Sequence, residues 1–185
     1  MNIVLFGMPT AGKGTQAELL SKEYNIPHIS TGDILREEMA NKTPLGLQID
    51  NIMRAGGLAP DGIVNNIIVN KLNKLNGWIF DGYPRSINQA ILFKSYIDTN
   101  NIDVRFFFIN INENLVWERS RIRLLKENRF EDASDDVIKK RIDVFYETTQ
   151  RAIEFFSHEE NFRIIDGNKS INDIFYEIKT LIKGR

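Results

Sequence analysis

The sequence has 185 residues, of which 42% are apolar and 26% charged, a balance typical of one compact globular domain. Its 24 basic and 25 acidic residues give a net charge of -1, which argues against binding to nucleic acid or to an anionic membrane through bulk charge. The absence of cysteine excludes disulfides, thiolate metal sites and cysteine nucleophiles. No apolar run approaches the roughly 20 residues that span a bilayer, and the N-terminus does not resemble a secretory signal, so we expect a cytoplasmic location.

Strand and helix patterns alternate along the chain, which predicts an α/β fold with a parallel sheet between two layers of helices. Short apolar runs predict strands at residues 3–6, 26–29, 78–80, 104–111 and 162–165. Helical patterns fall at about 13–23, 34–39, 45–55, 60–75, 87–97, from 113 onward, 137–156 and 170–183. Two regions, 30–59 and 120–135, break the alternation, and strand-free insertions of this kind are candidates for moving covers.

The segment Gly7 to Lys13 fits the pattern G-x-x-x-x-G-K and lies between a predicted strand and a predicted helix, the context that this phosphate-binding motif requires. Glycines let the backbone turn its N–H groups inward, the helix N-terminus adds a partial positive charge, and Lys13 adds a full one. The segment therefore predicts a polyphosphate site. Gly14 stands where Ser or Thr usually helps to hold Mg²⁺, with Thr15 one residue later, so a magnesium ion would depend on other groups.

Four separate segments resemble the signature motifs of nucleoside monophosphate kinases and, within them, of adenylate kinases: Gly7 to Gln16, Ser30 to Arg36, Asp81 to Arg85, and Gln89. Their order and spacing match along nearly the whole chain. The resemblance implies a P-loop NTPase-type α/β/α core at 1–29, 60–118 and 136–185, a helical monophosphate-binding insertion at 30–59 and a short lid at 119–135. It also implies Mg²⁺-dependent transfer of the terminal phosphoryl group of ATP to AMP, and a monomer. The longer lid that holds zinc through cysteines is absent, so no zinc is expected.

For the donor nucleotide, the resemblance implies that the phosphate loop wraps the ATP phosphates with Thr10, Ala11, Gly12, Lys13, Gly14 and Thr15. Arg119 and Arg123 would act on the same phosphates, and Lys169 lies in a turn that resembles the adenine-facing loop for ATP. Asp81 would position Mg²⁺ through water. A register shifted along the helix, which would pair Arg123 with Glu127, is the alternative for the two arginines.

For the acceptor nucleotide, the resemblance implies that AMP is held by Thr31, Arg36, Gly57, Leu58, Ala59, Gly82, Tyr83, Pro84, Arg85 and Gln89. Arg129 and Arg141 would complete this side, and the spacing between them is one residue longer than the family pattern, which leaves the lid's shape open. The catalytic cations implied are Lys13, Arg85, Arg119, Arg123, Arg129 and Arg141. His28 and His158 have no such motif and are expected to be structural or surface residues.

The chemistry explains this concentration of positive charge. Phosphoryl transfer needs two nucleotides in line and neutralisation of the charge on the moving group. The AMP phosphate is already an anion at neutral pH, because its second pKa is about 6, so no general base is expected. Arginine suits the task because its planar fork makes bidentate bonds to phosphate oxygens and stays charged.

Thr31 and Gln89 favour AMP over UMP or CMP, because a glutamine amide offers both the acceptor and the donor that adenine requires. The alternatives are a UMP/CMP or other small-molecule P-loop kinase, and a nucleotide-binding scaffold without turnover. The scaffold would be expected to lack the arginines that this sequence retains.

Overall fold

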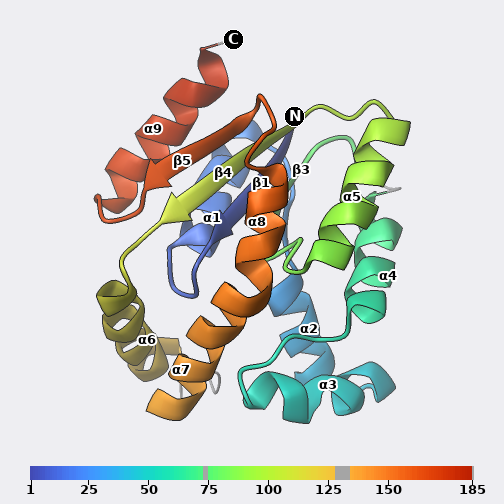
Figure 1. Cartoon of the computed structure of the whole chain (residues 1–185), viewed down its shortest axis with the longest axis vertical. Helices are drawn as coiled ribbons and strands as arrows, with labels where there is room; N and C mark the ends of the chain where they lie inside the picture. Colours follow the sequence, from blue (N-terminus) through green and yellow to red (C-terminus); the bar gives the residue numbers. More distant parts are fainter. Residues whose placement is uncertain (73–74, 128–133, 185) are drawn as a thin grey trace.

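The computed structural model describes residues 1–72, 75–127 and 134–184, and within them one parallel sheet carries helices on both faces (Figure 1). The strands are β1 (Asn2–Gly7), β2 (His28–Ser30), β3 (Trp78–Asp81), β4 (Val104–Asn110) and β5 (Phe162–Asp166). They pair in the order β2-β3-β1-β4-β5, and every pairing is parallel. The predicted five-stranded α/β fold is therefore confirmed.

The order of the strands indicates where on the sheet a ligand would bind. The chain runs from β1 outward to β2, returns to β3 beside β1, and then crosses to β4 and β5 on the other side of β1. In open sheets of this kind, ligands bind beyond the carboxyl ends of the strands, where the strand order reverses. The phosphate loop follows β1, and Asp81 ends β3. Both therefore lie at the expected crevice.

Helices connect the strands, with the following bounds: α1 (Lys13–Tyr24), α2 (Thr31–Ala40), α3 (Pro44–Arg54), α4 (Asp61–Leu72), α5 (Ile87–Thr99), α6 (Glu113–Glu127), α7 (Asp135–Val144), α8 (Gln150–Phe156) and α9 (Ile171–Lys183). A π-helical turn, η2 (Phe145–Thr149), joins α7 to α8. The helix predicted at 137–156 is thus one helical run with a π turn inside it. In Figure 1, α2 and α3 lie at the same end of the molecule as α6 and α7.

An aromatic cluster fills the core between the sheet and the α5–α8 layer. The Phe106 and Phe156 rings stack with centroids 4.6 Å apart, and Trp78 stacks on Phe80 at 4.3 Å. These side chains are almost fully buried. The adjacent pair Phe155 and Phe156 predicts two core side chains, and for Phe155 this prediction is wrong, since Phe155 is 37% exposed. Successive helical residues point about 100° apart, so the two rings cannot both face the sheet.

Two boundaries differ from the sequence-based expectation. Strand β2 begins at His28 rather than at residue 26, because Pro27 has no N–H to donate and contributes only its carbonyl, which accepts from Ile79 N at 2.9 Å. The run of polar residues at 126–136 predicts a loop, but α6 continues to Glu127, and α7 already begins at Asp135 with a Ser134 cap. Residues 128–133, within the predicted lid, lie outside the described part of the chain.

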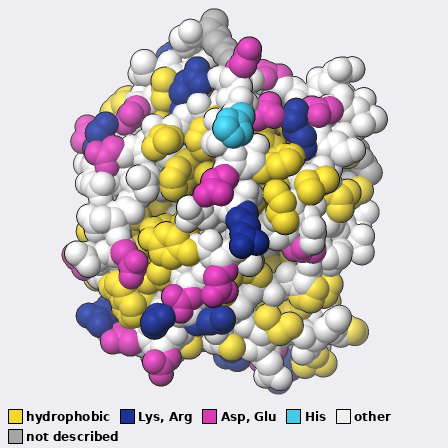
Figure 2. All heavy atoms as spheres, viewed as in Figure 1, with side chains coloured by type: hydrophobic (Ala, Val, Ile, Leu, Met, Phe, Trp, Pro, Cys, Tyr) yellow, Lys and Arg dark blue, Asp and Glu magenta, His cyan; other side chains and the backbone are white. Residues whose placement is uncertain are grey.

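On the face drawn in Figure 2, charged side chains are not gathered by sign. Figure 2 shows acidic and basic side chains intermingled on one face, in keeping with the net charge of -1. Among the described residues, none of the helices has the length and apolar character needed to cross a membrane.

Candidate active site

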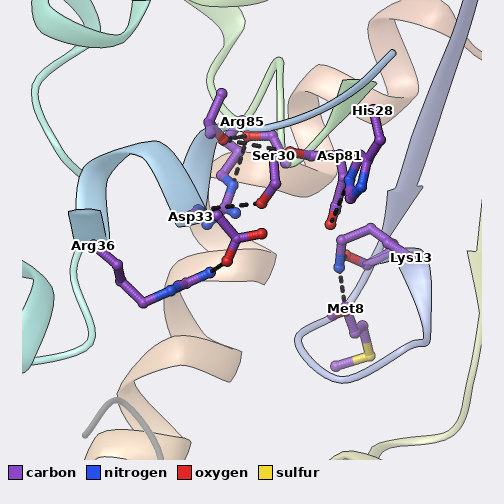
Figure 3. A network of polar contacts seen from close by, with 11 residues as sticks. Met8, Lys13, His28, Ser30, Asp33, Arg36, Asp81 and Arg85 are labelled. Carbon is purple, nitrogen blue, oxygen red and sulfur yellow. Dashed lines mark hydrogen bonds and ion pairs between the residues drawn. The ribbon is translucent and has the colours of Figure 1, made fainter. Parts of the chain in front are cut away.

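The phosphate loop turns between β1 and α1 through two left-handed positions. Gly12 has φ 91° and caps α1, and Thr10 has φ 59°, a conformation uncommon for a residue with a β-carbon. Lys13 folds back over the loop, and its Nζ donates to Gly7 O at 3.0 Å and to Met8 O at 2.8 Å (Figure 3). The loop thus holds its lysine beside the carboxyl end of β1.

The pKa of Lys13 lies well below the ordinary value for lysine. Burial is the main cause that lowers its pKa to about 8; the charge of Asp81 opposes the shift, and the charges of Arg85, Arg141 and Arg123 add to it. Three arginines thus lie close enough to Lys13 to affect its pKa, with Asp81 as the opposing charge. A cleft with these charges is suited to a multiply charged anion, which would stabilise the protonated amine.

Asp81 faces this positive cluster from the end of β3. Burial works to raise its pKa, but the neighbouring His28 and the charges of Lys13 and Arg85 outweigh burial, so the pKa lies below its ordinary value. Asp81 is therefore an ionised carboxylate at neutral pH. A β-carbon added to Gly14 would lie 3.4 Å from Asp81 Oδ2, so the carboxylate reaches the phosphate loop.

His28 is a neighbour of Asp81 that sequence reasoning missed. Its Nε2 lies 3.9 Å from Asp81 Oδ2, and both side chains point toward Lys13 in Figure 3. The β2–β3 register pairs Ser30 with Asp81, and His28 lies two residues earlier on the same face of the strand. Only the pairing of β2 with β3 places His28 beside Asp81, and the order of the strands along the sequence does not reveal that pairing.

Beside the phosphate loop lies a first hollow, here called the loop pocket. Its lining includes the predicted residues Thr10, Gly12, Lys13, Gly14, Thr15, Asp81, Arg119 and Arg123. Arg119 donates to Thr10 O at 3.5 Å and to Gly167 O at 3.2 Å, which ties α6 to the phosphate loop and to the turn after β5. Arg119 and Arg123 both line the pocket, so the register that pairs them stays the prediction. Ala11, within the loop, is buried and is absent from the described lining of the pocket.

A second hollow, the inner pocket, lies between the α2–α3 insertion and the helices α4, α5 and α7. It is lined by the predicted residues Thr31, Arg36, Gly57, Leu58, Ala59, Gly82, Tyr83, Pro84, Arg85, Gln89 and Arg141. Apolar side chains such as Leu35, Met53 and Val64 complete it. One predicted set of residues, scattered over more than a hundred positions of sequence, is thus brought to one cavity.

Gly82 anchors the polar wall of the inner pocket. Its carbonyl accepts from Thr31 Oγ1 at 2.7 Å and from Arg85 Nε at 2.8 Å. Its φ of 82° is left-handed, and an added β-carbon would lie 2.4 Å from a guanidinium nitrogen of Arg85. Glycine is required here both by the backbone conformation and by the close approach of Arg85.

The two pockets share one wall. Pro9, Lys13, Gly32, Arg36, Arg85 and Arg141 line both of them. Arg36 also forms an ion pair with Asp33, as Figure 3 shows. Four of these shared residues are cations, so two anions bound in the two pockets would meet over a common positive surface.

Among the described residues, Ala11 and Lys169 are the predicted site residues that line neither pocket. Lys169 Nζ donates to Glu177 Oε2 at 2.9 Å, and Lys169 is absent from the described lining of either pocket. Arg129 lies outside the described residues. Its predicted place in the site stays a prediction.

The carboxylate present fits a magnesium ion bound together with phosphates. No cluster of three or more His, Asp or Glu side chains that could hold a metal occurs among the described residues. Mg²⁺ in nucleotide sites uses one or two carboxylates with substrate phosphates and water, rather than an all-protein cage. An ionised Asp81 that reaches the phosphate loop meets that requirement.

A parallel sheet with a phosphate loop after β1, and two pockets that meet over shared cations, is the architecture of a nucleotide kinase that brings two substrates together. The family model described as adenylate kinase matches residues 5–161. The chain belongs to the adenylate kinase family.

Curated relatives match along essentially the whole chain. The adenylate kinase of Trichodesmium erythraeum is 39% identical over 186 aligned positions, which cover 97% of this chain and 96% of the relative. That of a Cyanothece species is 37% identical, covering 97% and 94%. That of Brevibacillus brevis is 35% identical over 214 positions and covers both chains fully. This last alignment is longer than the 185 residues of the chain, so the relative carries additional residues.

Proposed function

We propose that this chain transfers the terminal phosphoryl group of ATP to AMP, giving two ADP, over the wall that the loop pocket and the inner pocket share. The observation that carries the proposal is that Lys13, Arg36, Arg85 and Arg141 line both pockets. A phosphoryl group that passes from one pocket to the other would stay in contact with these cations throughout. Membership of the adenylate kinase family supports the choice of substrates.

The loop pocket takes ATP. Backbone N–H groups from Thr10 to Thr15 and the N-terminus of α1 would surround its phosphates, and Lys13 would exchange its two carbonyl contacts for phosphate oxygens. Arg119 and Arg123 lie on the same side of α6, where they would bind the outer phosphate oxygens. Lys169 would have to leave Glu177 to act on the adenine of ATP.

The inner pocket takes AMP. Arg36 and Arg85 would bind its phosphate, with Gly82, Tyr83 and Pro84 forming the wall beside it. Thr31, Gln89 and the backbone of Gly57, Leu58 and Ala59 would line the adenine. The apolar side chains of the pocket would cover the faces of the base.

The chemical step needs little from the protein beyond position and charge. An oxygen of the AMP phosphate forms a bond to the γ-phosphorus of ATP, while the bond from that phosphorus to the β–γ bridging oxygen breaks. The electron pair of the broken bond stays on ADP, and no proton has to move. Lys13, Arg85, Arg119, Arg123, Arg129 and Arg141 would stabilise the charge that spreads over the moving group.

Magnesium, held through water by Asp81, would supply further charge neutralisation on the ATP phosphates. The ionised state of Asp81 supports that role, and the family typically uses the metal. His28 beside Asp81 would help to hold the carboxylate in place.

The insertion at 30–59 would act as a flap over AMP and the segment 119–135 as a short lid over ATP, with 1–29, 60–118 and 136–185 as the core. Closure of both over the bound nucleotides would exclude water, which could otherwise accept the phosphoryl group. We further propose a cytoplasmic monomer that binds neither nucleic acid nor membrane, in keeping with the net charge of -1 and with the intermingled charge on the face that Figure 2 shows.

A coupled assay tests the proposal. ATP and Mg²⁺ are mixed in turn with AMP, CMP and UMP, and diphosphate formation is measured. We expect AMP to give the highest kcat/KM. Faster turnover of CMP or UMP would overturn the base assignment and favour the pyrimidine kinase, and ATP binding without turnover of any monophosphate would favour the scaffold.

A further inference from the structure

A polar network behind the inner pocket fixes the orientation of the Gln89 amide. Gln89 is 2% exposed and lines the pocket. Its Nε2 donates to Asp61 Oδ1 at 2.7 Å, and its Oε1 accepts from the backbone N–H of Arg85 at 2.8 Å. Asp61 is not part of the described lining of either pocket, so it contacts Gln89 from behind.

Asp61 is itself held in place by two helix N-termini. It is the first residue of α4, and its Oδ2 accepts from Ser86 Oγ at 2.8 Å. Ser86 caps α5, where its Oγ accepts from Gln89 N at 3.2 Å. A carboxylate at the start of a helix is stabilised by the helix dipole. The carboxylate is therefore a fixed acceptor in contact with the amide.

The two hydrogen-bond partners of the Gln89 amide have opposite roles: Asp61 accepts a hydrogen bond, and the Arg85 N–H donates one. The two ends of a glutamine amide are nearly the same shape, but the oxygen only accepts and the nitrogen only donates hydrogen bonds. An ionised carboxylate only accepts, and a backbone N–H only donates. If the amide of Gln89 turned over, its oxygen would face Asp61 and its NH₂ group would face the Arg85 N–H. Both contacts would become repulsive.

Amide orientation decides which purine can pair with Gln89. The edge of adenine presents an amino donor and a ring-nitrogen acceptor, so it needs an amide oxygen and an amide NH₂ in that order. Hypoxanthine presents a carbonyl acceptor and a ring N–H donor at the same two positions. It would pair with the same amide only after the amide turned over. The two bases are otherwise nearly identical in shape.

We propose that Asp61 is a specificity-determining positioning residue, which holds the Gln89 amide in the orientation that pairs with adenine and thereby rejects hypoxanthine. This inference rests on the proposed role of Gln89 toward the base of AMP. Asp61 acts on the base through Gln89 and touches neither the phosphates nor the transferred group.

The test compares AMP with inosine monophosphate as acceptors for the wild-type enzyme and for Asp61→Asn. An asparagine amide can offer either its oxygen or its NH₂ to Gln89. The substitution therefore removes the constraint that Asp61 places on the Gln89 amide and keeps the size of the side chain, while the Arg85 N–H remains. We expect the ratio of kcat/KM for AMP to that for inosine monophosphate to fall about tenfold, a factor that corresponds to 1.4 kcal/mol. The change should lie in KM for the monophosphates, with KM for ATP within about twofold of the wild type.

Asn65→Ala is the matched control. Asn65 lies one turn further along α4, and its Oδ1 accepts from the Tyr83 hydroxyl at 3.0 Å. Its loss disturbs the same helix and the same wall of the pocket without touching the amide of Gln89. We expect this variant to change the two kcat/KM values by the same factor and to leave their ratio unchanged.

The outcomes separate this proposal from the proposed function. An unchanged ratio in Asp61→Asn, or an equal loss for both nucleotides, would overturn the role of Asp61 even if the wild type prefers AMP. A wild type that prefers CMP or UMP would instead overturn the role of Gln89. If Asp61→Asn does not fold, Ser86→Ala frees one oxygen of the carboxylate, and we expect a smaller fall in the ratio. An unchanged ratio in that variant would equally overturn the proposal.

Discussion

The loop pocket and the inner pocket are built in different ways. The phosphate-binding part of the loop pocket comes from one continuous segment, Gly7 to Thr15, and depends on backbone N–H groups and a helix N-terminus. The inner pocket collects side chains from α2, α5 and α7 and from the turns after α3 and β3. A phosphate can be bound by a local motif because every nucleotide presents the same group. A base must be distinguished by side chains that only the tertiary structure brings together.

We expect the largest loss of activity from Arg85→Ala. Arg85 lines both pockets, and its Nε donates to the Gly82 carbonyl in the wall of the inner pocket. We expect kcat to fall on the order of 10³-fold, by analogy with other arginines that stabilise a phosphoryl transition state. ATP affinity should stay within a few-fold. Steady-state kinetics and ATP titration measure the two quantities.

Arg163→Ala serves as the control for a lost arginine. Arg163 is exposed on β5, where it donates to the Glu160 and Phe162 carbonyls, and it lines neither pocket within the described structure. Its kcat should match the wild type. A collapse of ATP affinity in Arg85→Ala with intact AMP binding would reverse the assignment of Arg85.

Gly82→Ala tests whether the inner pocket depends on a close backbone approach. The added β-carbon would lie 2.4 Å from a guanidinium nitrogen of Arg85, and φ 82° would cost about 1–3 kcal/mol for a residue with a side chain. We expect KM for AMP to rise about tenfold or more and KM for ATP to change little. Initial-rate kinetics at varied AMP and ATP provide the measurement.

Gly62→Ala is the matched glycine control. A β-carbon at Gly62 would meet nothing within 4 Å, and the residue lies in α4. Alanine there should raise stability by up to about 1 kcal/mol and leave both KM values unchanged. Equal rises in KM for ATP and AMP in Gly82→Ala would show that the two pockets are not independent.

The pKa of Lys13 predicts a proton linkage in the loop pocket. In the free protein, burial lowers this pKa to about 8, and bound phosphates would raise it. Above pH 8, ATP binding should therefore take up a fraction of a proton and weaken as pH rises. Calorimetric titration at pH 8.5, in two buffers with different ionisation enthalpies, measures the uptake.

The lowered pKa of Lys13 also predicts how the stability of the ligand-free protein depends on pH. An unfolded lysine with a pKa of 10.5 holds more protons than folded Lys13 between about pH 8 and 10.5, so this group makes the ligand-free protein more stable as pH rises through that window. Lys13→Arg, which stays charged, should abolish the proton uptake. Equal uptake in the variant and the wild type would assign it to another group.

The smallest effect is expected from Lys169→Ala. Lys169 forms an ion pair with Glu177 on the surface, away from the described lining of the loop pocket, and exposed pairs contribute little. We expect KM for ATP to change less than twofold. Glu177→Ala, which frees the lysine, provides the comparison. A fivefold or larger rise in KM for ATP in Lys169→Ala would support the adenine-facing role that the resemblance implies.

Several local features followed directly from residue order. The phosphate loop follows β1 as expected, and helices begin at Lys13, Ile87 and Ile171, within one residue of the expected starts, because each start depends on neighbours within one turn of chain. The five parallel strands followed from their short apolar runs. The boundary of β2 and the exposure of Phe155 did not, because strand pairing and helix rotation decide them.

The sequence by itself determined the class of fold and the position of the phosphate loop, since these depend on periodicity and on a motif with fixed spacing. Its resemblance to a family also predicted the cations of the site, of which Lys13, Arg36, Arg85, Arg119, Arg123 and Arg141 line the two pockets. Only the tertiary structure decided that His28 lies beside Asp81, that Lys169 lies apart from the loop pocket, and that Asp61 contacts Gln89 from behind. Those contacts join segments from different strands and helices. Their partners are set by the order of strands in the sheet and by the packing of helices on it, which no local pattern records.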